Sequence, residues 1–279
     1  MSDVRAELTR NDMEALFEGV KNWGRWGPDD ERGALNFITD TIRRDAAALV
    51  TEGVSVSCAL DFPTQPAPDN PRPAQHMKVV AGDACTTTGM PGMQSAMDFI
   101  GVAFHGMAVS HIDALCHVFV DEKMYNGFDA SDVKSTGAMR NSIMAGEDGI
   151  SGRGVLLDAP RHRGVPYLGI DEQIGPDELD AMAAAQGVEI REGDILLVST
   201  GRDARRAEKG SWAPMEGLAG LDGHCVQWLY DRKVAVLGSD GVSDSIPNGT
   251  ADQWPMPIHQ CGVAADRKST RLNSSHLVI

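Results

Sequence analysis

The stretch that decides the interpretation of this chain is residues 104–119, FHGMAVSHIDALCHVF. Four potential metal ligands fall within thirteen positions of it: His105, His111, Asp113 and His117. His111 and Asp113 are two residues apart, so both side chains point to the same side of an extended segment. His117 follows Asp113 by four residues, which is about one helical turn. A strand that ends near Asp113 and turns into a helix is therefore predicted to bring these three side chains together.

Two imidazoles and a carboxylate favour a borderline divalent ion such as zinc, manganese or iron. The preceding residues 97–104, MDFIGVAF, are apolar after Asp98, which predicts a buried strand leading to the site. A carboxylate at the end of a buried strand is costly without a cation. This favours a metal site at His111, Asp113 and His117, whereas His105 taken alone is better explained as an ordinary polar loop residue.

Composition excludes several classes of protein. The chain has 279 residues, 42% of them hydrophobic and 23% charged, which is typical of a globular protein with one large domain or two small ones. Its net charge of −15 repels nucleic acid phosphates and anionic lipids, so neither is an expected partner. No signal peptide or transmembrane run is visible, and five scattered Cys residues form no disulfide framework. These features predict a cytoplasmic protein.

The second half of the chain alternates strand and helix patterns, which predicts an α/β fold. The predicted strands are residues 154–158, 195–199 and 234–237, and the predicted helices are residues 176–186 and 225–231. In the first half, residues 13–20 and 41–52 are predicted helices and residues 54–60 a strand. Two irregular loops, residues 63–73 and 82–92, flank the strand before the motif and are predicted to form the rim of a pocket.

A second polar segment follows the last predicted strand. Residues 238–247, GSDGVSDSIP, place Asp240, Ser243 and Asp244 at the carboxyl end of that strand, where sites of α/β proteins form. Such residues either support a site or serve in capping and turns. His259 is a lone His in a Pro-rich segment, and on the residues alone it is better explained as structural.

The motif resembles the signature of the metal-dependent cyclase and kynurenine formamidase-like hydrolase family, His-x-Gly-Thr-His-x-Asp-x-Pro-x-His. His111, Asp113 and His117 fall on the second His, the Asp and the last His. The departures are Met107 for the first His, Val109 for the Gly, Ser110 for the Thr and Leu115 for the Pro. In the longer members of the family, which this chain resembles most, a residue at the position of His105 replaces the missing first His.

Further segments resemble these longer members, so the likeness spans residues 22–265. They are residues 24–39 (GRWGPDDERGALNFIT), 123–127 (KMYNG) and 234–247 (VAVLGSDGVSDSIP). The resemblance implies the swivelling β/β/α fold of the cyclases, a single α/β domain expected over residues 1–266. A homo-oligomer that acts on a small-molecule substrate is also expected.

The resemblance further implies a hydrolase of a small amide, formamide, or cyclic amide or lactone. His259 falls on a distant His that completes the family's metal site. The expected ligands of a zinc or manganese ion are thus His105, His111, Asp113 and His259. His117 is expected to carry the proton, since an imidazole with an unperturbed pKa of about 6.5 suits both directions of transfer. His117 as a further ligand is the competing assignment.

Two alternatives come from other classes of protein. A non-haem iron oxygenase would use His111, Asp113 and His259 as its facial triad, but that triad leaves His117 without a role. A catalytically decayed metal-binding protein would account for the departures at Met107 and Val109.

The last residues, 267–279 (RKSTRLNSSHLVI), differ from the rest of the chain. They are basic and Ser-rich after an acidic sequence, and they resemble translated adaptor sequence. We therefore predict a non-native tail that packs poorly, with His276 outside the metal cluster. Because the family supplies a further metal-site residue soon after the distal His, a ligand is expected to be missing here.

Overall fold

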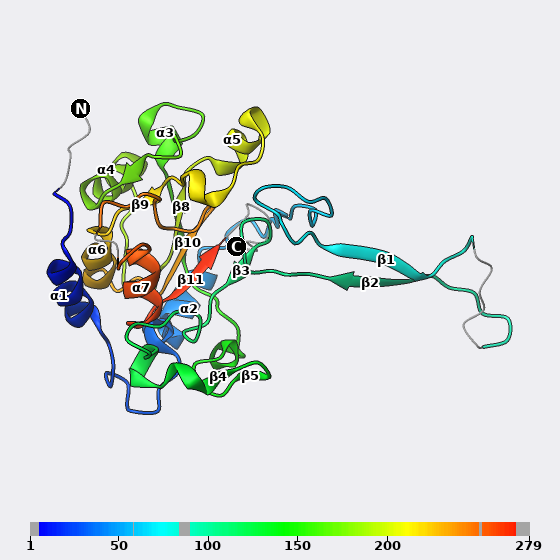
Figure 1. Cartoon of the computed structure of the whole chain (residues 1–279), viewed down its shortest axis with the longest axis horizontal. Coiled ribbons are helices and arrows are strands. Elements are labelled where there is room, and N and C mark those ends of the chain that lie inside the picture. The colour runs from blue at the N-terminus through cyan, green and yellow to red at the C-terminus, as the bar shows by residue number, and fades with distance from the viewer. Residues whose placement is uncertain (1–5, 58, 84–89, 251–252, 272–279) are drawn as a thin grey trace.

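A five-stranded sheet forms the centre of the molecule (Figure 1). The computed structural model describes residues 6–57, 59–83, 90–250 and 253–271. The strand order is β3-β11-β10-β8-β6. The bounds are β3 His111–Ile112, β6 Gly154–Asp158, β8 Ile195–Ser199, β10 Val236–Ser239 and β11 Lys268–Arg271. Strands β6, β8, β10 and β11 run parallel, while β3 is antiparallel to β11.

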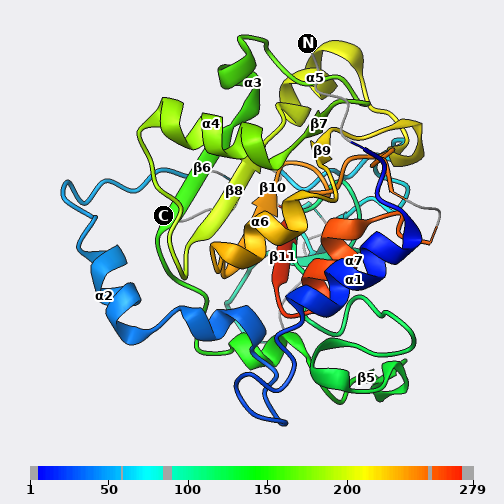
Figure 2. The same cartoon turned by 90° about the vertical axis from the view of Figure 1, so that its left-hand side faces the viewer.

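Four helices cover one face of this sheet (Figure 2). They are α1 Arg10–Val20, α4 Pro176–Gln186, α6 Cys225–Asp231 and α7 Pro257–Val263. Alternate strand residues point into this core, so Val155 and Leu157 of β6 are buried while Leu156 between them is exposed. The opposite face packs Val236 of β10 against Leu35 in a smaller cluster.

The remaining elements are short and surround the sheet. They are α2 Asp40–Ala47, α3 Ala159–Arg163, α5 Arg202–Lys209, η1 Gly33–Phe37, η2 Tyr125–Gly127, η3 Ala130–Asp132, β4 Val133–Lys134, β5 Gly137–Ala138, η4 Ile143–Gly146, β7 Gln173–Ile174, η5 Pro214–Glu216 and β9 Gly220–Leu221. Within the described residues, no helix has the length and apolar character that a membrane span requires.

The predicted α/β class is confirmed, and the second half of the chain agrees best with its sequence pattern. Helix α4 has the predicted bounds, with Pro176 in its first turn and Gly187 as a left-handed C-cap (φ 67°). Strands β6 and β8 also begin and end as predicted. In the first half, helix α2 is shorter than predicted, and residues 54–57, 59 and 60 form no strand and are exposed.

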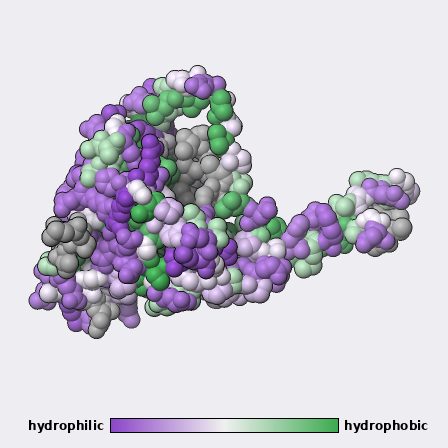
Figure 3. Space-filling view, turned by 90° about the horizontal axis from the view of Figure 1, so that it is seen from above, coloured by the Kyte–Doolittle hydropathy of each residue, from purple (hydrophilic) through white to green (hydrophobic). Residues whose placement is uncertain are grey.

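Two strands leave the body of the molecule as an arm. β1 Gln75–Val80 and β2 Met97–Gly101 form an antiparallel hairpin that projects away from the sheet (Figures 1 and 3). The prediction of a buried strand over residues 97–104 is therefore wrong: the strand ends at Gly101 and most of its side chains are exposed. An apolar run predicts a strand, but it does not specify which surface covers that strand.

The C-terminal segment is only partly described, and the described part belongs to the sheet. Arg267 is buried and its Nε donates a hydrogen bond to the Val234 carbonyl at 2.5 Å. The backbone of β11 pairs with both β10 and β3. The expectation of poor packing is therefore wrong for Arg267, and the backbone of residues 268–271 is part of the sheet. Residues 272–279, His276 among them, lie outside the described part, and the non-native origin of the tail stays a prediction.

Candidate metal centre

Asp113 lies at the centre of a cluster of imidazoles. Its side chain is only 4% exposed, and its Oδ1 lies 3.1 Å from His105 Nε2, 3.6 Å from His111 Nε2 and 3.8 Å from His117 Nε2. One ligand atom each of His105, His111 and Asp113 lie within 4.8 Å of one another. The rings of His105 and His117 stack with centroids 4.5 Å apart. The structure thus brings all four residues of the motif together.

The local backbone explains this convergence. His111 belongs to β3 and Asp113 follows it, so the two side chains share a side while Ile112 packs on the other side with the cluster around Leu35. The helix predicted after Asp113 is not formed. A turn replaces it, in which the His117 amide donates to the Ala114 carbonyl at 3.0 Å. The turn returns His117 to Asp113 as a helical turn would, so the predicted convergence holds with a different backbone.

The protonation of His111 suits metal binding. Its Nδ1 lies 2.9 Å from the Val109 carbonyl oxygen. A carbonyl oxygen only accepts hydrogen bonds, so Nδ1 carries the proton in the neutral ring. The lone pair of Nε2 then faces Asp113, which is the arrangement that a metal-binding imidazole needs.

His259 reaches Asp113 from helix α7. Its Nδ1 donates to Asp244 Oδ2 at 2.5 Å, and its Nε2 lies 3.7 Å from Asp113 Oδ2. The Asp244 carboxylate also accepts from the amides of Ile258 and His259, so it holds both the helix and the ring. His259 therefore contacts the second oxygen of Asp113, whereas the three other imidazoles surround the first.

The charges of this centre favour a bound cation. Burial alone would raise the pKa of Asp113, but the His259 hydrogen bond and the surrounding imidazoles hold it below its ordinary value. Burial would likewise lower the pKa of His259, yet hydrogen bonds to Asp113 and Asp244 raise it to about 9. Two buried carboxylates thus draw positive charge to this point, and the imidazoles around Asp113 offer nitrogen ligands. The donor set fits a divalent metal ion.

Two cavities meet at the histidines. His105, His111 and His117 line both of them. The first, of about 560 Å³, is also bordered by Asp113, His259 and Arg72. The second is an open cavity of about 850 Å³ with mainly apolar walls, which include Phe62, Val102, Phe104, Ile112 and Ile143. A substrate at this centre thus has on one side a chamber that also holds the charged side chains of Arg72 and Asp113, and on the other side a chamber with mainly apolar walls.

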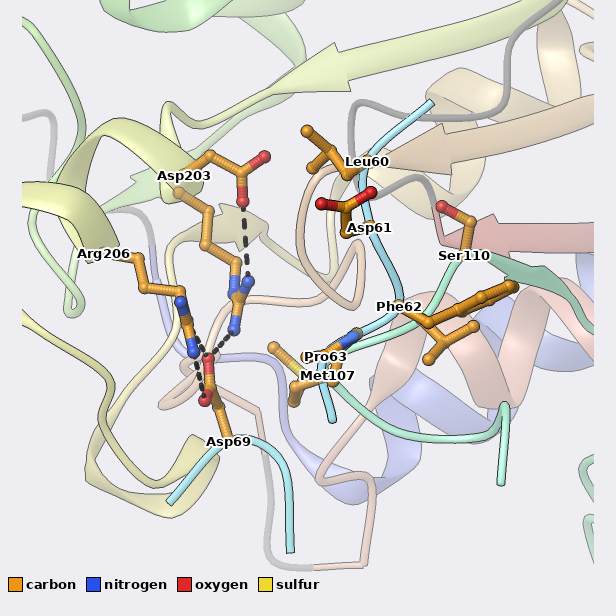
Figure 4. Close-up of a pocket in the computed structure, with 12 residues that line it drawn as sticks. Leu60, Asp61, Phe62, Pro63, Asp69, Met107, Ser110, Asp203 and Arg206 are labelled. Carbon is orange, nitrogen blue, oxygen red and sulfur yellow. Dashed lines mark hydrogen bonds and ion pairs between the residues drawn. The ribbon is translucent and has the colours of Figure 1, made fainter. Parts of the chain in front are cut away.

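The proline-rich loop, residues 63–73, borders the 560 Å³ cavity through Arg72, as predicted for a rim. An ion pair fixes this loop to helix α5, where the buried Asp69 accepts from Arg202 Nη2 at 2.8 Å and from Arg206 Nε at 2.7 Å (Figure 4). Met107 and Ser110 line the small cavity of about 130 Å³ beside this pair. The second predicted rim loop lies elsewhere: its described residues 82–83 and 90–92 connect β1 to β2 in the arm.

The polar segment after β10 is divided between two functions. Asp240 accepts from the backbone amides of Thr200, Gly201 and Arg202, which is turn and capping chemistry. Ser243 lines the 560 Å³ cavity, and Asp244 holds His259.

Met107, at the position of the motif's first His, is buried against Trp212 and Leu218, while His105 faces Asp113.

Sequence reasoning missed Arg72 and the apolar wall from residues 133–143. Arg72 stands between two prolines of the predicted rim loop, but nothing in the sequence singled out its side chain. The wall residues, such as Ile143, lie in a part of the sequence for which no helix or strand was predicted. Isolated apolar side chains in that segment were the only available signal.

Comparison with known proteins identifies the family. A family model described as "Putative cyclase" matches residues 42–244, which is more than half of the chain. The chain belongs to this cyclase family. The crystal structure of a novel cyclase resembles this cyclase-family chain with a TM-score of 0.78 and 26% sequence identity, over 90% of this chain and 86% of that one. The predicted cyclase-like fold is therefore confirmed.

Two isatin hydrolases share the fold at lower similarity. One, bound to the product analogue thioisatinate, gives a TM-score of 0.53 and 16% identity, over 80% of this chain and 82% of that one. Isatin hydrolase A from Labrenzia aggregata, bound to benzyl benzoate, gives a TM-score of 0.52 and 17% identity, over 82% of this chain and 84% of that one. No curated protein sequence matches the chain.

Proposed function

We propose that this cyclase-family protein is a metal-dependent hydrolase that opens a small amide, formamide, or cyclic amide or lactone with water. The observation that carries this proposal is the buried Asp113 with four imidazoles around it, at the junction of two cavities. The isatin hydrolases with this fold support it, because isatin is a cyclic amide.

In this proposal His105, His111, Asp113 and His259 hold a zinc or manganese ion. Such an ion, when bound, lowers the pKa of its water ligand to about 7 and polarises a carbonyl oxygen. The protein's own contribution is to fix the ligands: Val109 sets the ring of His111, and Asp244 sets the ring of His259.

His117 is assigned the proton transfer. Its side chain is 38% exposed, lines both cavities and approaches Asp113 at 3.8 Å. It can therefore reach the attacking water and the leaving atom from one position. In the proposed reaction its ring takes a proton from the water and returns it to the leaving nitrogen or oxygen.

The two cavities assign an orientation to the substrate. The apolar cavity receives the hydrocarbon part, because Phe62, Phe104 and Ile143 line it. Hydrolysis forms a carboxylate, and Arg72 borders the other cavity with no hydrogen bond or ion pair within the described part of the chain. Arg72 is therefore assigned to the carboxylate that the reaction releases.

The proposal is tested by metal analysis followed by a substrate screen. The purified protein is reconstituted with zinc, manganese or iron and assayed against isatin, N-formylanilines and small lactones. Hydrolysis that depends on zinc or manganese and disappears in Asp113→Ala is expected. Oxygen consumption that requires iron and 2-oxoglutarate would instead support the oxygenase alternative. Bound metal with neither activity would support the alternative of a catalytically decayed metal-binding protein.

A further inference from the structure

Two of the sequence segments singled out above, residues 24–39 and 123–127, supply none of the residues of the metal centre. They meet in the structure, where Asp30 Oδ2 accepts a hydrogen bond from the Tyr125 hydroxyl at 2.8 Å. Tyr125 is fully buried, and Asp30 also accepts from the Gly33 amide at 2.9 Å. The Asp30 carboxylate therefore fixes the first segment to the second.

Glu31, the next residue, holds the backbone of Asn141. Its Oε2 accepts from the Asn141 amide at 2.5 Å, and its Oε1 accepts from Arg140 Nη1 at 3.2 Å. Asn141 is fully buried in a left-handed conformation (φ 56°), which Asn adopts more readily than most residues. Its side-chain amide donates to the Tyr125 carbonyl at 2.8 Å. Both segments thus fix the position of Asn141.

Asn141 also holds the turn that carries His117. Its carbonyl oxygen accepts from the Cys116 amide at 3.2 Å. A second contact reaches the same turn from the first segment, since the buried Leu115 packs closely on Gly33, where a Cβ would lie 2.9 Å from Leu115 Cδ1. The backbone before His117 is therefore held at two points, while the imidazole stays open to the cavities.

The residues that follow Asn141 form part of the apolar wall. Ser142 and Ile143 line the 850 Å³ cavity, together with Ala114 and Cys116 of the turn. The proposed proton carrier and the wall that receives the hydrocarbon part of the substrate are thus fixed to one point of the backbone. A misplacement of about 1 Å in such an arrangement can cost about a hundredfold in rate. The support of Asn141 is therefore important for the proposed reaction.

We propose that Glu31 is a positioning residue, which sets His117 against the apolar wall by holding the backbone of Asn141. The inference rests on the function proposed for His117. Glu31 is not among the residues that line either cavity, so it acts on the reaction through Asn141. A hydrogen bond to a carboxylate is stronger than one between neutral groups, which suits a residue that fixes a buried backbone.

The first test needs no enzymatic activity. The full chain is stripped of metal and treated with iodoacetamide, and mass spectrometry of its peptides follows the half-buried Cys116 and the buried Cys225. Glu31→Ala releases the Asn141 amide, so the alkylation rate of Cys116 is expected to rise about fivefold, the factor for about one hydrogen bond. The rate at Cys225 should not change. Glu31→Gln keeps an acceptor oxygen and is expected to recover most of the difference. An unchanged rate at Cys116 in Glu31→Ala overturns the proposal.

The second test measures turnover per bound metal ion, with a substrate from the screen described above. We expect kcat of Glu31→Ala to fall by about 10- to 100-fold at unchanged metal content, because His117 is less well placed. Glu178→Ala is the matched control, since Glu178 is similarly buried and also pairs with an arginine, Arg163, but on α4. It should change neither kcat nor the alkylation of Cys116.

Equal changes in Glu31→Ala and Glu178→Ala would indicate a general loss of stability and overturn the proposal, as would an unchanged kcat in Glu31→Ala. If no substrate is hydrolysed by the wild type, the proposed function fails, and the alkylation of Cys116 still decides whether Glu31 holds the turn. Circular dichroism checks the fold of each variant. If Glu31→Ala does not fold, Glu31→Asp replaces it with the same expected results, because its carboxylate is one methylene shorter.

Discussion

Asp113 is the residue on which the metal centre depends, because three imidazoles approach one of its oxygens and His259 approaches the other. Replacing it with Ala removes the only anionic ligand of the proposed set. We expect Asp113→Ala to lose most of the bound zinc or manganese, measured by metal analysis of the purified protein. Asp98→Ala is the matched control, since Asp98 also contacts an imidazole, that of His76, but in the arm. Full metal occupancy in Asp113→Ala would exclude the site as described.

The position of His117 permits two assignments, proton carrier or metal ligand, and a substitution of this residue distinguishes them. As the proton carrier, it is needed for turnover but not for binding the ion. We expect His117→Ala to keep its metal while kcat falls by about 10²- to 10⁴-fold, the usual contribution of a general acid or base. Loss of metal in parallel with activity would make His117 a ligand.

Asp244 acts on the metal centre through His259. Its carboxylate fixes the proton of His259 on Nδ1 and also holds the first turn of α7. We expect Asp244→Asn to weaken metal binding by about 10- to 100-fold, as for other residues that orient a ligating His. Competition with a chelator of known affinity measures this. Asp240→Asn, whose carboxylate caps α5 instead, should leave the metal affinity unchanged.

At the residue scale, the sequence predicted which side chains come together better than it predicted the backbone that brings them together. The spacing of His111, Asp113 and His117 predicted their convergence, because a turn and a helical turn both return position i+4 to position i. His259 is far away in the sequence, so only the resemblance to a family could join it to the motif. Arg72 could not be predicted, since its place depends on how the loop around it is fixed to α5.

At the scale of elements, local signals predicted helices and central strands. Pro176 and Gly187 mark the ends of α4, and the apolar run of β8 is buried on the central sheet. The arm was missed because MDFIG is as compatible with an exposed ribbon as with a buried strand. A single sequence carries no direct signal of which of the two it will be.

The ion pair between the rim loop and α5 is expected to stabilise the fold. Asp69 and Arg202 are both buried, so Asp69→Ala leaves a guanidinium without its main partner. Removing one member of a buried pair costs about 3–5 kcal/mol. We expect a loss of this size in the free energy of unfolding, measured with urea. Asp203→Ala is the control: its contact with Arg202 is partly exposed, and such pairs contribute about 1 kcal/mol or less. Equal losses in both variants would contradict this account.

The same pair predicts a dependence of stability on pH. Burial alone would raise the pKa of Asp69, but Arg206 and Arg202 outweigh it and hold the pKa below its ordinary value. A carboxyl with a depressed pKa stabilises the fold above its unfolded pKa of about 3.9, and this contribution is lost as the pH falls through the folded value. The stability difference between wild type and Asp69→Asn should therefore shrink below about pH 4. A stability difference that is independent of pH would show that the charge of Asp69 does not contribute to the stability of the fold.

At the scale of the whole molecule, the sequence predicted the family but gave no sign that residues 268–271 pair with the central sheet. Composition separated residues 267–279 from the rest, and the KSTR segment lacks the apolar alternation of a strand. Its backbone nevertheless forms β11 between β10 and β3. Hydrogen bonds of the main chain need no particular side chains, so a strand between two others can accept a sequence that no pattern would predict.

The position of β11 leads to a prediction about truncation. β11 is the neighbour through which β3, with His111, joins the sheet. We expect a chain that ends at Asp266 to lose stability, at about 1 kcal/mol for each hydrogen bond lost, and to bind metal more weakly because His111 is less well held. A chain that ends at Arg271 keeps β11 and is the control, with unchanged stability and metal affinity. Thermal unfolding and chelator competition measure both quantities. If the two truncations behave alike, β11 does not support the metal centre. If a C-terminus from another cyclase-family member strengthens metal binding beyond that of the full chain, the tail lacks a ligand, as the sequence predicted.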